Sequence, residues 1–184
     1  MESNIKDKVM LWRDMVRVEL KGTNIKLPIV LTIIDVESKG EQTVFNHCLP
    51  PNPEQYESSY ESNSHPKGPV QETLQSLCSW GLMQIRGKES RDLGFGRKYM
   101  ADLCAYPALN ILYGVKKLSI LYNKGITGSK DLLREYLGSS GVIYSADDGI
   151  PTNLGYSNKD NPLEWYRCNP KKLDLAYRRM EEYK

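Results

Sequence analysis

Glu37 is the residue whose position in this sequence best suits acid–base chemistry. It directly follows the apolar stretch 27–36. Burial disfavours a charged carboxylate, and so does the partial negative charge at a helix C-terminus. Both effects favour a carboxyl group that keeps its proton near neutral pH, as a general acid requires. The alternative at this point is a solvated acid at a helix end, paired with Lys26 or Lys39.

A second candidate feature is the stretch Gly81-Leu82-Met83-Gln84. A glycine beside an apolar pair indicates close backbone approach, and Gln84 adds one amide that hydrogen bonds can hold in place. The stretch alone is equally compatible with a simple packing turn. Asp35, two residues before Glu37, is expected to point to another side of its helix and to be structural or exposed.

Hydrophobic periodicity predicts that helices position these residues. Apolar residues spaced by three and four predict an amphipathic helix over residues 4–21, with Asn4 as its N-cap. Pro28 and Gly40 mark a helix start and stop around the apolar stretch. Its β-branched residues would also suit a buried strand, but the caps and the length favour a helix. This helix is predicted to form the buried centre of the domain.

Further helices are predicted downstream, each with its own stop or start signal. A short helix over 88–93 ends at Gly94, and a long one begins at Pro107 and ends at Gly125. Ser129 is predicted to cap the next helix, with Gly138 as its stop. Asn169-Pro170 is predicted to open a final helix that carries Leu173, Ala176 and Met180.

Residues 40–70 differ from the rest, with five prolines and no helical or alternating period. They are predicted to form a long irregular insert, either functional or a surface insert without a role. The order of elements predicts a mainly α, single domain over residues 1–184. Outside the insert, the sequence shows no obvious second carboxylate to pair with Glu37.

Composition narrows the class of protein. The chain has 25 Lys and Arg against 23 Asp and Glu, so there is no electrostatic argument for nucleic acid or anionic lipid. No secretion signal and no apolar run long enough to span a membrane are seen. Without an export signal, the cysteines are expected to be buried thiols, and His47 and His65 match no zinc spacing. Twelve tyrosines against two phenylalanines suit sugar-stacking surfaces or a core with wet edges. The four cysteines are Cys48, Cys78, Cys104 and Cys168.

Glu37-Ser38 after an apolar helix, followed downstream by Gly81-Leu82-Met83-Gln84-Ile85, resembles the lytic transglycosylase (SLT-type) branch of the lysozyme-like superfamily. The stretches CSWGLMQIRGKESRDLGF and LCAYPALNILYGVKKLSILY are also similar to phage and bacterial members. The resemblance covers roughly residues 25–140. Tyr136 falls where such enzymes place an active-site tyrosine, but Leu137 stands where they usually have asparagine.

The resemblance implies a role for each matching residue. Glu37 would be the catalytic acid, and Ser38 would help to orient it. Gly81, Met83 and Gln84 would belong to the sugar-binding site, with Met83 and Gln84 lining the cleft. The Tyr136 hydroxyl would contact Glu37 or the substrate. Trp80 is expected to lie in the core rather than in the cleft.

The resemblance also implies a reaction on bacterial peptidoglycan. One carboxyl group would protonate the glycosidic oxygen and then take the proton of the muramic C6 hydroxyl, leaving a 1,6-anhydro end. The alternatives are a hydrolytic muramidase (a lysozyme or endolysin) that uses an acid within 54–72, and a non-catalytic murein-binding or structural phage protein. No metal or organic cofactor is implied, and a monomer is expected. A phage lysis enzyme or virion component, made in the cytoplasm and acting on the cell wall, fits the missing signal.

Overall fold

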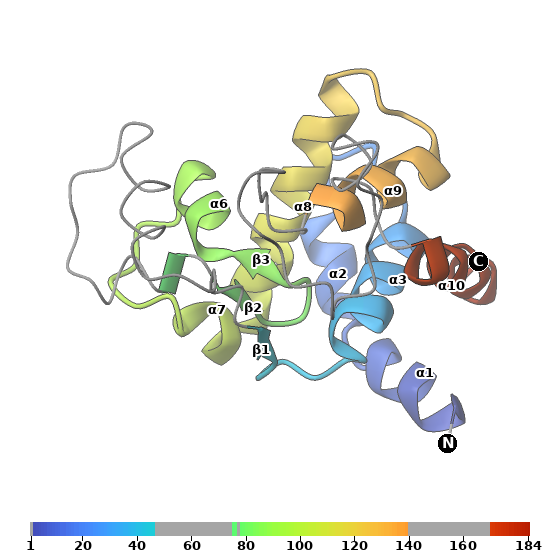
Figure 1. The fold of residues 1–184 in the computed structure, drawn as a ribbon, viewed down its shortest axis with the longest axis horizontal. Helices are drawn as coiled ribbons and strands as arrows, with labels where there is room; N and C mark the ends of the chain where they lie inside the picture. Colours follow the sequence, from blue (N-terminus) through green and yellow to red (C-terminus); the bar gives the residue numbers. More distant parts are fainter. Residues whose placement is uncertain (1, 47–74, 77, 140–169) are drawn as a thin grey trace, which may run out of the picture.

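The computed structural model describes residues 2–46, 75–76, 78–139 and 170–184. In these residues, helices surround a small antiparallel sheet (Figure 1). The mainly α fold predicted from the sequence is thus confirmed. Most of the predicted insert, residues 47–74, lies outside the described residues.

The N-terminal helix predicted over 4–21 is two helices, α1 (Glu2–Met10) and α2 (Arg13–Glu19). The turn between them is held by Trp12, whose backbone N–H donates to the Val9 carbonyl at 3.1 Å. The Trp12 indole Nε1 also donates to the Gly40 carbonyl at 2.9 Å. This long-range bond fixes the break, and periodicity alone does not show it. The prediction of Asn4 as N-cap is wrong, because α1 begins at Glu2.

The apolar stretch forms α3 (Leu27–Ser38), so the helix interpretation is confirmed over the strand. Pro28 lies in its first turn, where a missing N–H costs little. Lys39 ends the helix in the left-handed conformation, with φ 54°, and Gly40 follows at φ 78°. The Lys39 and Gly40 N–H groups donate back to the Asp35 and Ile34 carbonyls, which satisfies the last turn.

Three short strands that the sequence analysis did not predict form an antiparallel sheet in the order β1-β2-β3. Phe45 pairs with Trp80, and Trp80 pairs with Ile85. Strands of two residues are too short to show an alternating pattern, which is why the sequence gave no signal for them. The strands are β1 (Phe45–Asn46), β2 (Ser79–Trp80) and β3 (Ile85–Arg86).

The next helices follow the predicted stops with one exception. Gly94 and Gly125, both with positive φ, lie just beyond the ends of α6 and α8 as predicted. The stop at Gly138 is wrong, because α9 runs through it to Ser139. Tyr136 and Leu137 are buried there, and their packing outweighs the helix penalty of glycine. The bounds are α6 (Gly87–Asp92), α7 (Asp102–Ala105), α8 (Pro107–Asn123) and α9 (Ser129–Ser139).

The start of α9 also differs from the prediction. The Leu132 N–H donates to the Gly128 carbonyl at 2.8 Å, so the first turn already begins at Gly128. Ser129 is therefore the first residue of the helix and not its cap.

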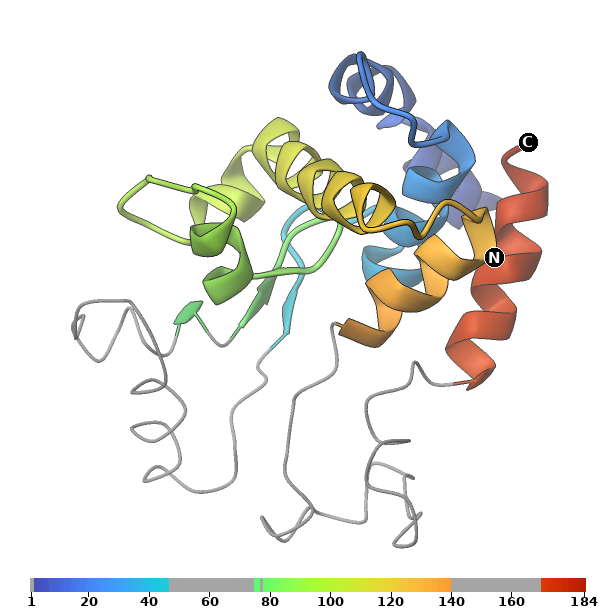
Figure 2. The same cartoon turned by 90° about the horizontal axis from the view of Figure 1, so that it is seen from above.

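The final helix, α10 (Pro170–Glu182), begins at Pro170 as predicted. It packs beside α3 and α9, although it follows them by a long stretch of sequence (Figures 1 and 2). Ala176, Met180 and Tyr183 are buried in the main core. The C-terminal helix therefore covers the helix that carries Glu37.

Two hydrophobic clusters form the core of the described residues. The larger one surrounds α3 and collects side chains from α1, α2, α8, α9 and α10. The smaller one lies beside the sheet and includes Trp80, Phe95 and Leu103. The long helix α8 contributes to both, through Ile111 and Tyr113 respectively. None of the helices described has the length and apolar character needed to cross a bilayer.

Candidate active site around Glu37

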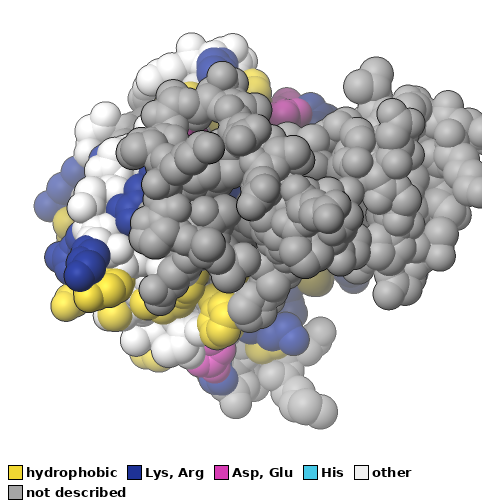
Figure 3. Space-filling model, turned by 60° about the vertical axis from the view of Figure 1, so that its left-hand side comes forward, with side chains coloured by type: hydrophobic (Ala, Val, Ile, Leu, Met, Phe, Trp, Pro, Cys, Tyr) yellow, Lys and Arg dark blue, Asp and Glu magenta, His cyan; other side chains and the backbone are white. Residues whose placement is uncertain are grey.

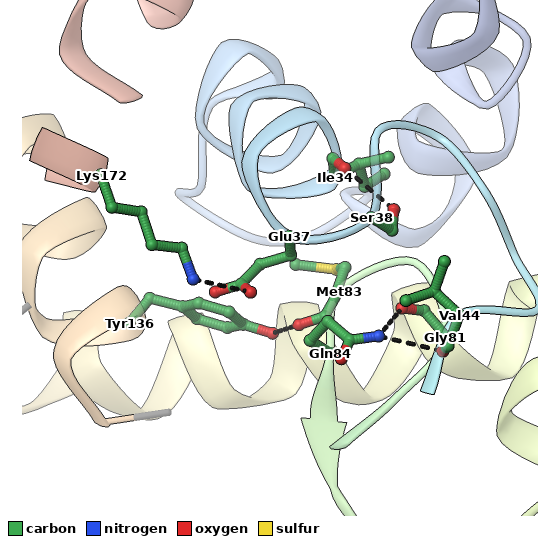
Figure 4. Close-up of polar contacts among 9 residues, drawn as sticks. All are labelled: Ile34, Glu37, Ser38, Val44, Gly81, Met83, Gln84, Tyr136 and Lys172. Carbon is green, nitrogen blue, oxygen red and sulfur yellow. Dashed lines mark hydrogen bonds and ion pairs between the residues drawn. The ribbon is translucent and has the colours of Figure 1, made fainter. Parts of the chain in front are cut away.

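Glu37 lies in the last turn of α3, facing the sheet and α9 (Figure 4). Its side chain is only 6% exposed. Oε2 accepts a hydrogen bond from the Lys172 ammonium at 2.9 Å. Oε1 is buried, and the described residues offer it no hydrogen-bond partner. Glu37 is thus a buried carboxyl group and not a solvated helix-end acid, and its cation is neither Lys26 nor Lys39.

Ser38 does not orient Glu37 by direct contact. Its hydroxyl is buried and donates to the Ile34 carbonyl at 2.9 Å, on the side away from the Glu37 carboxyl (Figure 4). The bond tightens the last turn of α3. An effect on Glu37 would therefore come through the helix backbone.

Hydrogen bonds from the backbone and from a side-chain amide hold the turn between β2 and β3 in place. The Gly81 N–H donates to the Val44 carbonyl at 2.8 Å. The Gln84 amide Nε2 donates to the same carbonyl at 3.0 Å and to the Gly81 carbonyl at 2.8 Å. A Cβ at Gly81 would lie 2.5 Å from Asn110 Nδ2, and φ there is +69°. The expected close backbone approach at Gly81 is present.

Met83 and Gln84 are buried in this turn, at 0% and 3% exposed. The Gln84 side chain holds the turn through the bonds given above, and the Met83 side chain packs against Gly114 of α8. Their predicted contact with sugar stays a prediction.

Asn110, on α8, is a residue that the sequence analysis missed. Its side chain is fully buried. Oδ1 accepts from the Met83 N–H and Nδ2 donates to the Trp80 carbonyl, each at 2.7 Å. The available signal was an amide among the apolar residues of a buried helix. The amide fixes the turn relative to α8.

Tyr136, on α9, is 1% exposed, and its ring lies beside the Glu37 carboxyl (Figure 4). Its hydroxyl donates to the Met83 carbonyl at 2.9 Å, so its proton goes to the hairpin and not to Glu37. Burial, and then the negative charges of Glu89 and Glu37, raise the pKa of Tyr136 well above its usual value. Tyr136 is therefore a neutral donor that ties α9 to the turn.

A buried ion pair next to Tyr136 was also missed. The Lys117 ammonium lies 3.1 Å from Glu89 Oε2 and 4.3 Å from the centre of the Tyr136 ring. Burial lowers the pKa of Lys117, and the charges of Glu89 and Glu37 oppose that shift. The Glu89 side chain is 29% exposed. The site thus contains a second carboxylate that the sequence analysis did not identify.

The tyrosines in the described part of the chain include both buried and exposed side chains. Tyr113, Tyr136 and Tyr183 are buried. Tyr99 and Tyr106 are about half exposed, and the cations of Lys98 and Arg97 lie over their rings. Figure 3 shows hydrophobic and basic side chains next to one another on one face.

Two further predictions, for Trp80 and Asp35, agree with the structure. Trp80 belongs to the core, as predicted: it is 9% exposed and stacks on Phe45. Asp35 is buried and structural, and accepts a hydrogen bond from the Tyr183 hydroxyl at 2.8 Å. A surface pocket of about 430 Å³ is lined by residues such as Val115, and includes none of the predicted site residues.

The predictions on cysteines and metal fall partly outside the described residues, which exclude Cys48, Cys168, His47 and His65. The Cys104 thiol donates to the Val44 carbonyl at 3.7 Å, and burial raises its pKa. Among the residues that are described, no cluster of metal-ligating side chains occurs.

The geometry brings a buried carboxyl group, a neutral tyrosine and a rigid hairpin turn to one place. The family model described as the transglycosylase SLT domain matches residues 14–136, more than half of the 184 residues, and spans Glu37, the turn and Tyr136. Comparison with curated proteins and with solved structures gives no significant match. The chain belongs to the transglycosylase SLT domain family.

Proposed function

We propose that this chain cleaves the β-1,4 linkage between MurNAc and GlcNAc in peptidoglycan as a lytic transglycosylase, with Glu37 as acid and then base. Membership of the SLT domain family supports lytic transglycosylase-type activity on peptidoglycan. The observation that carries the role of Glu37 is its carboxyl group, 6% exposed at the end of α3, with Oε1 buried and without a described partner. A carboxyl group held in a site shielded from water can serve as a general acid for a leaving group.

The proposed reaction conserves every atom of the substrate. Glu37 gives its proton to the glycosidic oxygen as the bond from the muramic C1 to that oxygen breaks. The 2-acetamido group of the muramic residue stabilises the developing positive charge. The Glu37 carboxylate then takes the proton of the muramic C6 hydroxyl, and the C6 oxygen bonds to C1. The products are a 1,6-anhydro end and a free GlcNAc hydroxyl, and no water is consumed.

Replacing Glu37 tests the proposal. Glu37→Gln keeps the size of the side chain but removes the acid, so release of muropeptides from purified sacculi is expected to stop. The matched control is Glu41→Gln, because Glu41 is an exposed acid on the same segment, 51% exposed and paired with Lys8. Circular dichroism checks that both variants fold. Full activity of Glu37→Gln would end the proposal.

A hydrolytic muramidase is the second candidate, and Glu89 is the observation in its favour. Hydrolysis normally uses a second carboxylate to position water or to stabilise charge. Glu89 is partly exposed and acts on Tyr136 together with Glu37. The acids of 54–72 that were predicted for this role lie outside the described residues.

Mass spectrometry separates the two outcomes. Anhydro ends are lighter than reducing ends by one water, and only hydrolysis in ¹⁸O water labels the product. If the chain is a lytic transglycosylase, Glu89→Gln is expected to release the same 1,6-anhydro products as the wild type. Labelled reducing ends in the wild type, lost in Glu89→Gln, would favour the muramidase.

A murein-binding or structural phage protein would bind sacculi and release nothing. A dye-release assay on cell walls distinguishes it from both enzymes. Delivery as a phage lysis enzyme or virion component stays a prediction, and detection of the protein in purified virions would support the latter.

A further inference from the structure

The cation that binds Glu37 comes from outside the segment that matches the SLT family. Lys172 lies in the first turn of α10, whereas the family match ends at residue 136. Its Nζ donates to Glu37 Oε2 at 2.9 Å across 135 residues of sequence. The Lys172 side chain is 32% exposed and that of Glu37 is 6% exposed. The contact thus closes one side of the carboxyl group.

We propose that Lys172 is a positioning residue that assigns different roles to the two oxygens of Glu37. Lys172 would hold Oε2, so that Oε1 carries the proton that goes to the glycosidic oxygen. This inference rests on the proposed function of Glu37. It makes α10 a working part of the active site, although α10 lies beyond the family match.

The assignment of the oxygens follows from hydrogen-bond chemistry. An ammonium group has donors and no acceptor, so it can only bind a lone pair of the carboxyl group. The carbonyl oxygen of a carboxylic acid is a better acceptor than its hydroxyl oxygen, so the arrangement in which Lys172 binds Oε2 favours the proton of Glu37 on Oε1. Oε1 is the oxygen that is buried and has no partner among the described residues. Holding a reacting group in one geometry lowers the barrier, and small misplacements cost rate.

Lys172 is placed by a helix that is itself anchored. The Tyr183 hydroxyl donates to Asp35 Oδ2 at 2.8 Å, and Arg179 Nε lies 3.4 Å from the same oxygen. Asp35 and Glu37 both lie on α3. Arg179 of α10 and Tyr183 just after it contact Asp35, whereas Lys172 of α10 contacts Glu37. Ala176, between Lys172 and Arg179 in the sequence, is fully buried. The packing of α10 against α3 therefore fixes the position of the Lys172 ammonium.

Other charges also act on Glu37. From α8, Lys117 interacts with Glu37 but is bonded to Glu89 of α6, and from α9 the neutral Tyr136 faces it. On α3, the Asp35 carboxylate contacts the Tyr183 hydroxyl and Arg179. Lys172 is the cation that the described structure bonds directly to the Glu37 carboxyl.

The Lys172 ammonium also faces the negative charge that Glu37 carries after it has given up its proton, and opposite charges at this distance attract. Removing the charge of Lys172 is therefore expected to lower kcat.

The test compares Lys172→Met and Lys172→Arg with Lys184→Met in the full chain. Lys184 is the matched control, an exposed lysine after the end of α10 that pairs with Glu181. In Lys172→Met, kcat is expected to fall at least about tenfold with KM nearly unchanged. Lys172→Arg, which keeps the cation, is expected to restore most of kcat.

A second measurement does not depend on turnover. Urea unfolding of Glu37→Gln, Lys172→Met and the double variant forms a thermodynamic cycle. The double variant is expected to lose less stability than the two single variants added together, because Lys172→Met alone leaves a buried carboxylate without its cation. Additive losses would contradict the contact.

The outcomes separate the two proposals. A folded Lys172→Met variant with wild-type kcat overturns the positioning role, even when Glu37→Gln is inactive. The same loss of kcat in Lys172→Arg, or a rise in KM as large as the loss of kcat, also overturns it. A wild-type chain that releases no muropeptides ends the proposed function, and the positioning role of Lys172 ends with it whatever the unfolding cycle shows.

Discussion

Asn110 holds the backbone of Met83: its Oδ1 accepts the Met83 N–H at 2.7 Å, inside the core. The same side chain donates to the Trp80 carbonyl on the other side of the turn. One amide therefore fixes both ends of the turn that carries Gly81 and Gln84. Because the Tyr136 hydroxyl bonds the Met83 carbonyl, the position of α9 depends on the same turn.

Asn110→Ala is expected to lower the free energy of unfolding by about 2–6 kcal/mol, because it leaves two buried backbone groups without partners at about 1–3 kcal/mol each. Urea denaturation measures the change. Asn123→Ala, at the exposed end of the same helix, is the control and is expected to change little. Equal losses in the two variants would show that the amide is not what holds the turn.

Gly114→Ala tests the packing of Met83 against α8. A Cβ at Gly114 would collide with Met83 Sδ and would lie 3.1 Å from Met83 Cβ. Met83 is fully buried, so it cannot move into solvent. The variant is expected to lose about 1–3 kcal/mol of stability. Muralytic activity is expected to fall with it, because the Met83 carbonyl binds the Tyr136 hydroxyl. Gly96→Ala is the control, since nothing lies within 4 Å of its added Cβ. A stable, fully active Gly114→Ala would contradict the packing.

Tyr136→Phe is expected to change how stability depends on pH. Burial raises the pKa of Tyr136, so above pH 10 the unfolded chain loses this proton while the folded chain keeps it. The contribution of Tyr136 is therefore fully present below about pH 10 and is lost as pH rises.

At pH 8 the Tyr136→Phe variant is expected to be less stable than the wild type by about 1 kcal/mol, for the lost hydrogen bond to Met83. The gap is expected to narrow between about pH 10 and 11. Tyr183, whose pKa is also raised, is present in both proteins and cancels. Denaturation curves at each pH measure the difference in stability between the two proteins. A difference that does not change with pH would refute the link between the protonation of Tyr136 and folding.

Asp35→Ala is expected to loosen α10. It removes the acceptor of the Tyr183 hydroxyl and the anion facing Arg179, whose side chain is 12% exposed. Loss of one partner of a buried pair costs about 3–5 kcal/mol. Asp14→Ala, at a carboxyl group 91% exposed, is the control and is expected to cost at most about 1 kcal/mol. Calorimetry compares the two melting temperatures, and similar values would contradict the anchoring role of Asp35.

Sequence alone predicted most of the helices and placed Glu37 at the end of one of them. The apolar run between Pro28 and Gly40 predicted α3 because its local signals agree with its burial, and Glu37 follows from the end of that run. The order Glu37-Ser38, then Gly81 to Gln84, then Tyr136 identified the family, because these residues meet in space and keep their order in the chain.

Only the tertiary structure decided what surrounds Glu37. The cation Lys172, the amide of Asn110 and the Lys117–Glu89 pair belong to helices far from the acid in sequence, and no local period reports such contacts. The break at Trp12 and the helix through Gly138 were likewise decided by a long-range hydrogen bond and by burial. Local patterns specify which face of a helix is buried, whereas the partner of a buried charge is selected by which elements pack against that face.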